Sequence, residues 1–420
     1  MALALLTGLL PVRAARGQAA SQPARAREPE VKAAGAILVD AQSGQVLFER
    51  NADVRRAPAS TTKIMTAVLL IEELPLDEMV EADKEVAETD GSSLYMTPGE
   101  RISARDLLYA LLLRSANDAC VAVAKAITGS EASFAELMNE KAKAIGTTST
   151  HFTNPNGLPD ARHYSTARDL SKIACYAARL PVFNQVVATK FRLISRATGN
   201  EPRMLRNHSK FLWYYAGADG IKTGYTVAAG RCFVGSATRN GWRLISVVLN
   251  SPDMYGETAR LLDYGFSAFE PVVLIEHGRP MGTVPVRGGL ESVVGATSGS
   301  AVRTVVSRGT PAVVSFRRKT RRISAPVRRG ATIGEATAYV NGASVATVQL
   351  VANRDVPVLP PARAAGRLAW RFAVTMLAVM VFWHVASRPQ GTGRRWDRIT
   401  TGMRDFDAFR ARDRQRSQGN

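Results

Sequence analysis

The chain has 420 residues, of which 46% are hydrophobic and 22% are charged. This is the composition of a globular protein, so it excludes wholesale disorder, collagen and a multi-span membrane protein, and the length is enough for two or three domains. Three cysteines without Cys-x-x-Cys spacing exclude a disulfide scaffold, and with only five histidines they argue against a Cys/His metal cage.

The net charge of +19 is concentrated in the C-terminal part of the chain. Residues 271–420 contain 24 Lys/Arg against 8 Asp/Glu, which leaves only +3 for the first 270 residues. Basic surfaces attract nucleic acid, anionic lipid or acidic wall polymers. Because the sequence has no zinc finger, RNP aromatic motif or glycine-rich phosphate loop, we expect no nucleic-acid partner. The basic run at 317–329 is interpreted as a solvated face, with anionic lipid or wall polymer as the alternative contact.

The two ends of the chain predict an exported protein that is held at a membrane. Residues 1–20 are predicted to be a signal-like segment, although the charged n-region is missing and a disordered tail is the alternative. Residues 368–387 are predicted to be a membrane anchor helix, with a helix lying in the interface as the alternative. Residues 388–420 form a basic tail, which the positive-inside rule places in the cytoplasm, so the body of the protein would be extracytoplasmic.

Between these ends, residues 21–34 are rich in Pro, Ala, Arg and Glu and are predicted to be a linker. The segment 35–270 has strand patterns near both of its ends and helical patterns between them. In chain order we expect strand 36–40, strand 46–49, helix 61–73, helix 106–113, helix 118–127, helix 166–178, strand 231–237, strand 242–249 and helix 257–269. This order predicts an α/β (α+β) domain with helices packed on an antiparallel sheet. Residues 271–355 then predict a small all-β domain, and residues 356–367 a second linker.

The first of three short motifs is Ser-x-x-Lys at residues 60–63. At the start of the expected helix, Lys63 would lie one turn along the same face from Ser60 and within reach of its hydroxyl. Serine becomes a good nucleophile only when a base takes its proton, and a lysine is a base only when it is neutral. Burial and a helix N-terminus favour that neutral form. By itself, the spacing is also typical of an N-cap serine followed by a surface lysine.

The second motif is Ser115-Ala116-Asn117, which lies between two expected helices. On a turn, the Ser115 hydroxyl and the Asn117 amide would point into one cleft. There the serine would relay a proton, and the asparagine would accept a hydrogen bond from Lys63 and hold a substrate amide. The alternative is that Asn117 simply caps the helix that begins at Asp118.

The third motif is Lys222-Thr223-Gly224. On a strand, Lys222 and Gly224 would face one way and Thr223 the other. An edge strand offers backbone groups to an extended peptide, and Gly224 would let that peptide approach the backbone closely. Lys222 would suit an anion such as a C-terminal carboxylate. The alternative is a turn into a hairpin with an exposed lysine.

Together and in this order, the three motifs are those shared by penicillin-binding proteins and class A β-lactamases. The sequence resembles the low-molecular-mass penicillin-binding proteins, the serine-type D-alanyl-D-alanine carboxypeptidases. The resemblance extends to four longer segments, residues 58–67, 154–159, 164–170 and 219–226. It covers residues 35–270 strongly, whereas the β-rich segment matches the family's C-terminal domain only in kind.

The resemblance implies a β-lactamase/transpeptidase-like catalytic domain, on the outer side of a bacterial cell membrane and anchored by a C-terminal helix. Ser60 would be the acyl-accepting nucleophile and Lys63 its general base. Ser115 and Asn117 would line the cleft, relay protons and orient the substrate. The enzyme would remove the terminal D-alanine from peptidoglycan stem peptides, and β-lactams would acylate the same serine. No cofactor and no metal are implied.

The same resemblance implies how the substrate is held. Lys222 and Thr223 would bind the carboxylate of the leaving D-alanine, and Gly224 would lie against the substrate backbone. The backbone amides of Ser60 and Tyr225 would form the oxyanion hole. Two positions depart from the family pattern. Ala116 stands where the family commonly has glycine, which puts the shape of that turn in question. Tyr225 stands where some members have histidine, but the implied role in the oxyanion hole uses only the backbone amide of this residue.

Several alternatives stay open at this point. A serine β-lactamase-like hydrolase would share the fold and the motifs, but no convincing Glu-x-x-Leu-Asn segment occurs between residues 117 and 222. A non-catalytic wall-binding module would not need three intact motifs. A nucleic-acid binder is suggested by charge alone. Endopeptidase and transpeptidase activities use the same first step as carboxypeptidase activity, so the sequence does not separate them.

Overall fold

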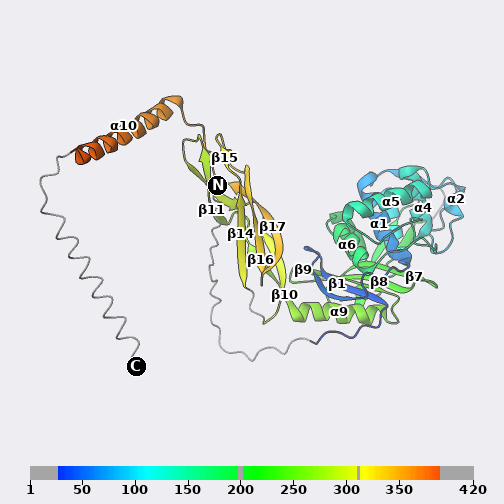
Figure 1. Ribbon diagram of the computed structural model, residues 1–420. Helices are drawn as coiled ribbons and strands as arrows, with labels where there is room; N and C mark the ends of the chain where they lie inside the picture. Colours follow the sequence, from blue (N-terminus) through cyan, green and yellow to red (C-terminus); the bar gives the residue numbers. More distant parts are fainter. Residues whose placement is uncertain (1–26, 197–201, 310–312, 388–420) are drawn as a thin grey trace, which may run out of the picture. The chain divides into compact units, whose positions relative to one another are not determined.

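The structure is a computed structural model, and it describes residues 27–196, 202–309 and 313–387 (Figure 1). The predicted signal-like segment and the predicted basic tail therefore lie outside the described residues. The chain divides into two compact units. One contains the residues up to 281 with 297–319 and 334–350, and the other contains 282–296, 320–333 and the residues from 351 on.

The centre of the first unit is a five-stranded sheet in the order β2-β1-β9-β8-β7. Its strands are β1 (Gly35–Asp40), β2 (Val46–Arg50), β7 (Ala218–Thr226), β8 (Gly230–Arg239) and β9 (Trp242–Leu249). Every neighbouring pair is antiparallel, and Ala36 of β1 lies opposite Val248 of β9. The sheet thus joins strands from the start and the end of the segment 35–270. β7 lies at one edge of this sheet and pairs with β8.

Helices cover both faces of this sheet, because successive residues of its central strands are apolar and point to opposite sides. On β1, Ile37 and Val39 belong to one buried cluster, whereas Ala36 and Leu38 belong to another. The first cluster contains residues of several helices, among them α1 (Lys63–Glu73), α4 (Asn117–Thr128), α5 (Glu131–Ile145), α6 (Ala167–Ala177) and α7 (Pro181–Ala188). The second contains α9 (Met254–Ala268). Helices packed on an antiparallel sheet were predicted, and this architecture is confirmed.

Helix α1 is the central helix of the domain. All eight residues from Lys63 to Leu70 are buried, as expected for a helix that is surrounded by other elements. A 3-10 turn, η1 (Ala59–Thr62), leads directly into it. A second irregular segment follows α3 (Ala104–Tyr109), which widens into the π-helical turn η2 (Ala110–Arg114) before α4 begins. η1 contains Ser60 of the first motif, and η2 ends directly before Ser115 of the second motif.

Short elements that the sequence analysis did not predict surround this core. They are β3 (Met79–Glu81), α2 (Lys84–Ala87), β4 (Arg101–Ser103), β5 (Phe191–Ile194), β6 (Arg203–Arg206) and α8 (Phe211–Tyr214). β3 pairs with β4 and β5 pairs with β6, both antiparallel.

The residues after α9 form strands, as predicted. β10 (Phe269–Ile275) pairs antiparallel with β13 (Val302–Ser307). A six-stranded sheet has the order β14-β16-β17-β12-β11-β15. Its strands are β11 (Pro280–Arg287), β12 (Val293–Ser298), β14 (Val314–Thr320), β15 (Ile323–Ser324), β16 (Thr332–Val340) and β17 (Ala343–Ala352).

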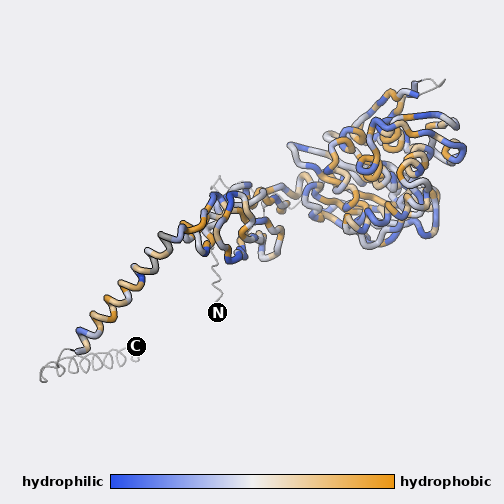
Figure 2. Tube along the Cα trace, turned by 90° about the horizontal axis from the view of Figure 1, so that it is seen from above, coloured by the Kyte–Doolittle hydropathy of each residue, from blue (hydrophilic) through white to orange (hydrophobic). Residues whose placement is uncertain are grey.

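Residues Pro361–Ala386 form the long helix α10, and apolar residues occupy much of it (Figure 2). A helix was predicted here, at 368–387, but its predicted membrane crossing is not supported. In the part of the chain that the structure describes, no helix is both long enough and apolar enough to cross a membrane. Arg371 interrupts the apolar stretch of α10.

Candidate active site

The Ser-x-x-Lys motif lies where η1 passes into α1. Ser60 is in the 3-10 turn, Lys63 is the first residue of α1, and the Lys63 Nζ donates to the Ser60 Oγ at 3.0 Å. Ala59, just before the serine, has a positive φ of 49°, a conformation that is uncommon and costly for a residue with a side chain. Backbone strain of this kind is typical of functional turns. The strained turn places Ser60 at the N-terminal end of α1.

The Lys63 side chain is completely buried, so the alternative of a surface lysine is wrong. Its Nζ also donates to the Asn117 Oδ1 at 2.7 Å and to the Asn156 carbonyl oxygen at 2.6 Å. These three acceptors are all neutral groups. Burial lowers the pKa of Lys63 from its ordinary value to about 8, against the opposing effect of nearby Cys120 and Asp118. A substantial neutral fraction of this amine near neutral pH makes it a competent general base.

The Ser-x-Asn motif lies where η2 ends and α4 begins. Ser115 adopts a left-handed conformation with φ 63°, and Asn117 is the first residue of α4. The Asn117 Oδ1 accepts from Lys63, while its Nδ2 donates to the Asp90 carbonyl at 2.7 Å. The side chain therefore does not cap α4, and that alternative is wrong. Ala116 has φ −59° and is buried, so the backbone there suits alanine without strain.

The Lys-Thr-Gly motif lies on the edge strand β7. Lys222 is 1% exposed, so the alternative of an exposed lysine is also wrong, and its Nζ donates to the Thr223 carbonyl at 2.9 Å. Burial, and then the positive charge of Lys63, lower the pKa of Lys222 well below its ordinary value. A carboxylate beside Lys222 would restore the charged form, because an opposite charge favours it. This amine is therefore suited to a negative ligand.

The backbone of β7 passes close to the nucleophile turn. A Cβ added to Gly224 would lie 3.0 Å from the Ser60 nitrogen and 3.1 Å from the Thr61 nitrogen. The sequence analysis predicted a close approach of the substrate to Gly224, whereas the close neighbour in the structure is the protein's own nucleophile turn. The next residue, Tyr225, exposes 65% of its surface. The backbone of β7 at Gly224 therefore lies beside the backbone amide of Ser60.

The structure thus brings five of the eight predicted site residues together by direct contacts, close approach or electrostatic interaction: Ser60, Lys63, Asn117, Lys222 and Gly224. Ser115, Thr223 and Tyr225 lie on the same elements, but within the part of the chain that the structure describes no hydrogen bond joins their side chains to the other five. Ser115 is 7% exposed at the end of η2.

The loop at 153–163 supports the site, and the sequence analysis assigned it no role. Gly157 has φ +85°, and a Cβ there would lie only 2.0 Å from the Ala59 carbonyl oxygen. His163 Nδ1 accepts from the Thr153 amide at 3.1 Å, so its Nε2 carries the proton and donates to the Thr62 Oγ1 at 2.9 Å. Burial lowers the pKa of His163 to about 4, which keeps this tautomer neutral. The loop therefore braces both ends of the Ser-x-x-Lys turn.

The carboxylate of Asp118 supports the other side of the site. It accepts from the Ser93 hydroxyl at 2.6 Å, the Leu94 amide at 3.0 Å and the Met96 amide at 3.1 Å. This anchors the loop whose Asp90 carbonyl holds the Asn117 amide. No short sequence pattern points to Asp118 or to the Asn156 carbonyl. Their partners are distant in the chain, and a backbone oxygen has no residue signature.

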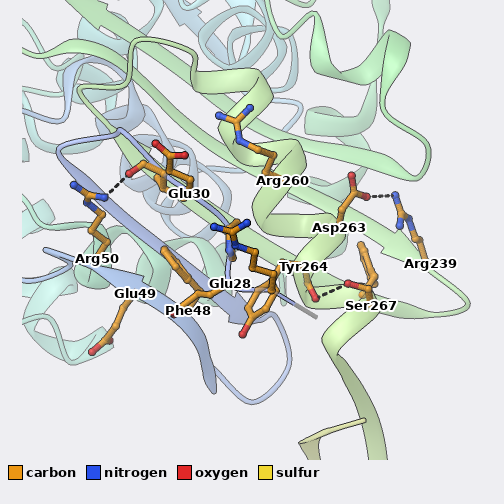
Figure 3. A pocket seen from close by; sticks show the side chains of 14 residues that line it. Glu28, Glu30, Phe48, Glu49, Arg50, Arg239, Arg260, Asp263, Tyr264 and Ser267 are labelled. Carbon is orange, nitrogen blue, oxygen red and sulfur yellow. Dashed lines mark hydrogen bonds and ion pairs between the residues drawn. The ribbon is translucent and has the colours of Figure 1, made fainter. Parts of the chain in front are cut away.

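A larger cavity of about 1220 Å³ lies elsewhere, between residues 27–31, β2 and α9. Figure 3 shows Arg50 and Arg260 beside it, with the Arg239–Asp263 ion pair at 3.0 Å. None of the three motifs lines this cavity. It has no serine with a neighbouring base, so size alone does not make it the active site.

The comparison with known proteins agrees with this geometry. Residues 21–253 match the family model described as D-alanyl-D-alanine carboxypeptidase. The chain belongs to the D-alanyl-D-alanine carboxypeptidase family. It is a serine peptidase of the hydrolase class that acts on peptidoglycan. Residues 269–358 match the C-terminal domain of penicillin-binding protein 5.

Three relatives illustrate the extent of the match. D-alanyl-D-alanine carboxypeptidase DacF of Bacillus subtilis is 30% identical over 84% of this chain and 93% of its own length. DacC of Escherichia coli is 34% identical over 78% of this chain and 85% of its own length. The structure of penicillin-binding protein 5 from Haemophilus influenzae superimposes with a TM-score of 0.68 at 30% identity, over 79% of this chain and 99% of that one. The carboxypeptidase therefore matches relatives over nearly their whole length.

Proposed function

We propose that Ser60 is the nucleophile of this carboxypeptidase and that Lys63 is its general base. The observation that carries the proposal is the buried Lys63 amine at 3.0 Å from the Ser60 hydroxyl. In its neutral form, Lys63 accepts the Ser60 proton as the Ser60 Oγ attacks the carbonyl carbon between the last two D-alanines. The tetrahedral intermediate then collapses, the C–N bond breaks, and the proton passes to the amine of the leaving D-alanine. Water hydrolyses the resulting ester.

The substrate is held by the groups around this pair. Lys222 and Thr223 bind the terminal carboxylate, while Ser115 and Asn117 line the opposite wall and orient the scissile amide. Further basic groups support an anion at this end of the cleft. The charges of Lys222 and Arg114 both act on His208, whose pKa is lowered to about 4 by burial first and by these charges second. The terminal carboxylate would meet a positive environment there.

The oxyanion that forms during the attack is bound by the backbone amides of Ser60 and Tyr225. The close approach of Gly224 to the Ser60 nitrogen supports this assignment, because it brings the two backbone segments together. Donors aimed at developing charge contribute about 3 kcal/mol each in other serine enzymes. The exposed Tyr225 side chain is not needed for this role.

Replacement of the nucleophile tests the proposal directly. We expect Ser60→Ala to abolish covalent labelling by a fluorescent penicillin. It should also reduce D-alanine release from a D-Ala-D-Ala peptide by a factor on the order of 10⁶. Mass spectrometry of released D-alanine and gel fluorescence provide the two readouts. Ser267→Ala, at an exposed serine of α9, is the matched control and should behave as wild type. A Ser60→Ala protein that is still labelled would contradict the assignment.

The same labelling experiment addresses the serine β-lactamase alternative. In the carboxypeptidase the penicilloyl ester on Ser60 persists, whereas a β-lactamase would release it quickly. The hydrogen-bond partners of the Lys63 amine in the described residues are a hydroxyl, a side-chain amide and a backbone carbonyl, and none is a carboxylate, which favours a slow loss of the label. A label that disappears within seconds of removing free penicillin would favour the hydrolase alternative.

The remaining organisation of the chain is also a proposal. We propose a catalytic domain over residues 35–270 and a β-rich domain over 271–355, which the two family matches at 21–253 and 269–358 support. We further propose that α10 attaches the protein to the outer side of the bacterial cell membrane. Trp370 and Trp383 are 71% and 74% exposed, as interfacial aromatic residues would be.

A further inference from the structure

A pocket of about 640 Å³ lies next to the nucleophile turn and has no role in the reaction described so far. Ala59 and Gly157 form its end nearest to Ser60, and Thr226 and Ala228 line it where β7 ends. Leu158 and Pro159 add apolar wall. The pocket therefore adjoins the nucleophile turn and the end of β7.

The proposed orientation of the substrate decides which part would enter this pocket. The terminal carboxylate lies at Lys222 and the scissile carbonyl lies beside Ser60 and Tyr225. The substrate therefore runs antiparallel to β7, and the residues before the D-Ala-D-Ala pair follow this strand toward Thr226. Each residue along an antiparallel pair faces the next residue of its partner. The first residue upstream of the D-Ala-D-Ala pair would thus lie beside Thr226. Because β7 ends there and residues 227–229 form a turn, the next two residues would leave the strand beside the pocket, which Thr226 and Ala228 line.

The charge of the pocket indicates what it would bind. The exposed Arg55 guanidinium lies 4.6 Å from the centre of the Tyr164 ring, and no carboxylate of the described residues forms an ion pair with it. Arg56 is already engaged, because its Nη2 donates to the Ala34 carbonyl at 3.1 Å. Asp160 accepts from the Arg162 amide at 2.7 Å and is 3.8 Å from the Arg162 guanidinium. Arg55 is thus an oriented cation that lacks a carboxylate partner.

We propose that this pocket binds the upstream part of the stem peptide and that Arg55 pairs with a side-chain carboxylate of that peptide. The inference rests on the proposed function, because it uses the same nucleophile and the same substrate direction. Stacking on Tyr164 presents the planar guanidinium, which matches a carboxylate in geometry. The apolar wall would take the aliphatic part of the same residue. Arg55 is a specificity-determining residue in this scheme and does not touch the reacting atoms.

The test uses peptides that end in D-Ala-D-Ala and differ in one side chain. Glutamate or its uncharged isostere glutamine is placed at the first, second or third residue upstream, and acetyl-D-Ala-D-Ala is the truncated substrate. For wild type we expect one position at which glutamate gives a kcat/KM about threefold to tenfold higher than glutamine, within the range of a partly exposed charge pair. The preference should fall as ionic strength rises.

In Arg55→Gln this preference should disappear, while Arg55→Lys should keep part of it. Hydrolysis of acetyl-D-Ala-D-Ala and penicillin labelling should be unchanged in both variants. Arg179→Gln, at an exposed arginine that does not line this pocket, is the matched control. The proposal is overturned if wild type shows no glutamate preference at any position. It is also overturned if Arg55→Gln keeps the preference or slows all substrates equally. A wild-type protein that releases D-alanine from no peptide would instead refute the proposed function itself.

Discussion

Lys63 combines two properties that rarely occur together in a lysine, complete burial and hydrogen bonds only to neutral acceptors. Burial disfavours the charged amine, and this lowers its pKa to about 8. The charged amine donates to all three acceptors, whereas the neutral amine keeps its two hydrogens for Asn117 and Asn156 and turns its lone pair to the Ser60 hydroxyl. The site thereby obtains a base that is partly neutral at neutral pH without a histidine or a carboxylate beside the serine.

The pH dependence of acylation follows from this lowered pKa. Lys63 acts as a base only when it is deprotonated, so the acylation rate should rise with pH and level off above about 8. Well below that value the rate should increase about tenfold per pH unit. The second-order rate constant for penicillin labelling between pH 6 and pH 9 measures this directly. A rate that is flat over the range, or that falls as pH rises through 8, would show that Lys63 is not the titrating base.

For individual residues, the sequence predicted the side chains of the site well, but it did not predict the groups that hold these side chains in place. Ser60, Lys63 and Asn117 were found because a helix turn and a short motif constrain which side chains meet. The Asn156 carbonyl was missed, because a backbone acceptor can be supplied by any residue. The sequence analysis gives His163 no role, since its partner Thr62 is 101 positions away and no local pattern links them.

Among the elements, the contact between β7 and η1 decides whether the site is complete. The strand supplies Lys222 and the proposed oxyanion donor of Tyr225, while η1 supplies Ser60. Gly224 is the residue at which the two backbones come closest. The geometry of the oxyanion hole is therefore set by the spacing of a strand and a turn that are far apart in the chain.

A single methyl group at Gly224 should disturb this spacing. In Gly224→Ala the new Cβ would be 3.0 Å from the Ser60 nitrogen and 3.2 Å from the Ala59 Cβ, so one of the backbones must shift. We expect penicillin acylation to slow by at least about tenfold, a partial loss compared with the roughly hundredfold or greater effect of removing an oxyanion donor. The melting temperature should change little. Rapid-mixing labelling and thermal denaturation provide the two measurements.

Gly366→Ala is the matched control, because a Cβ at Gly366 would meet no atom within 4 Å. It should leave the acylation rate and the melting temperature unchanged. Wild-type acylation in Gly224→Ala would mean that β7 does not position the reacting carbonyl.

The elements themselves were only partly predictable. α1, α4, β8 and β9 follow clear apolar periodicity, and their predicted positions agree with the structure within a few residues. The π-helical turn η2 was predicted as ordinary helix, because its five residues, Ala110–Arg114, are apolar apart from the last and carry no signal for a wider turn. The hairpin of β5 and β6 was missed because its strands have four residues each and several exposed positions.

For the whole molecule, the sequence indicated the order of the domains from changes in composition and charge. The balanced charge before residue 271 and the basic excess after it correspond to the helix-containing part and the β-rich part. The membrane crossing at α10 was inferred from a short uncharged stretch, and in the described residues no helix meets the requirements for it.

Removal of α10 tests the proposed attachment. A chain that ends at Pro360 should lose its association with the membrane fraction and should keep penicillin labelling, because all proposed site residues precede residue 226. Fractionation of cells followed by labelling of each fraction measures both properties. A truncated protein that remains in the membrane fraction would assign the attachment to another part of the chain.

The pairing of β1 with β9 has a consequence for biosynthesis. Ala36 has no neighbour on that side until Val248 has been made, and β7 must also be in place before the cleft exists. Pairings between residues so distant in the chain form late and slowly. The ribosome must therefore synthesise almost the entire catalytic segment before the Ser60 hydroxyl can become reactive. A prematurely terminated chain would not cleave peptidoglycan.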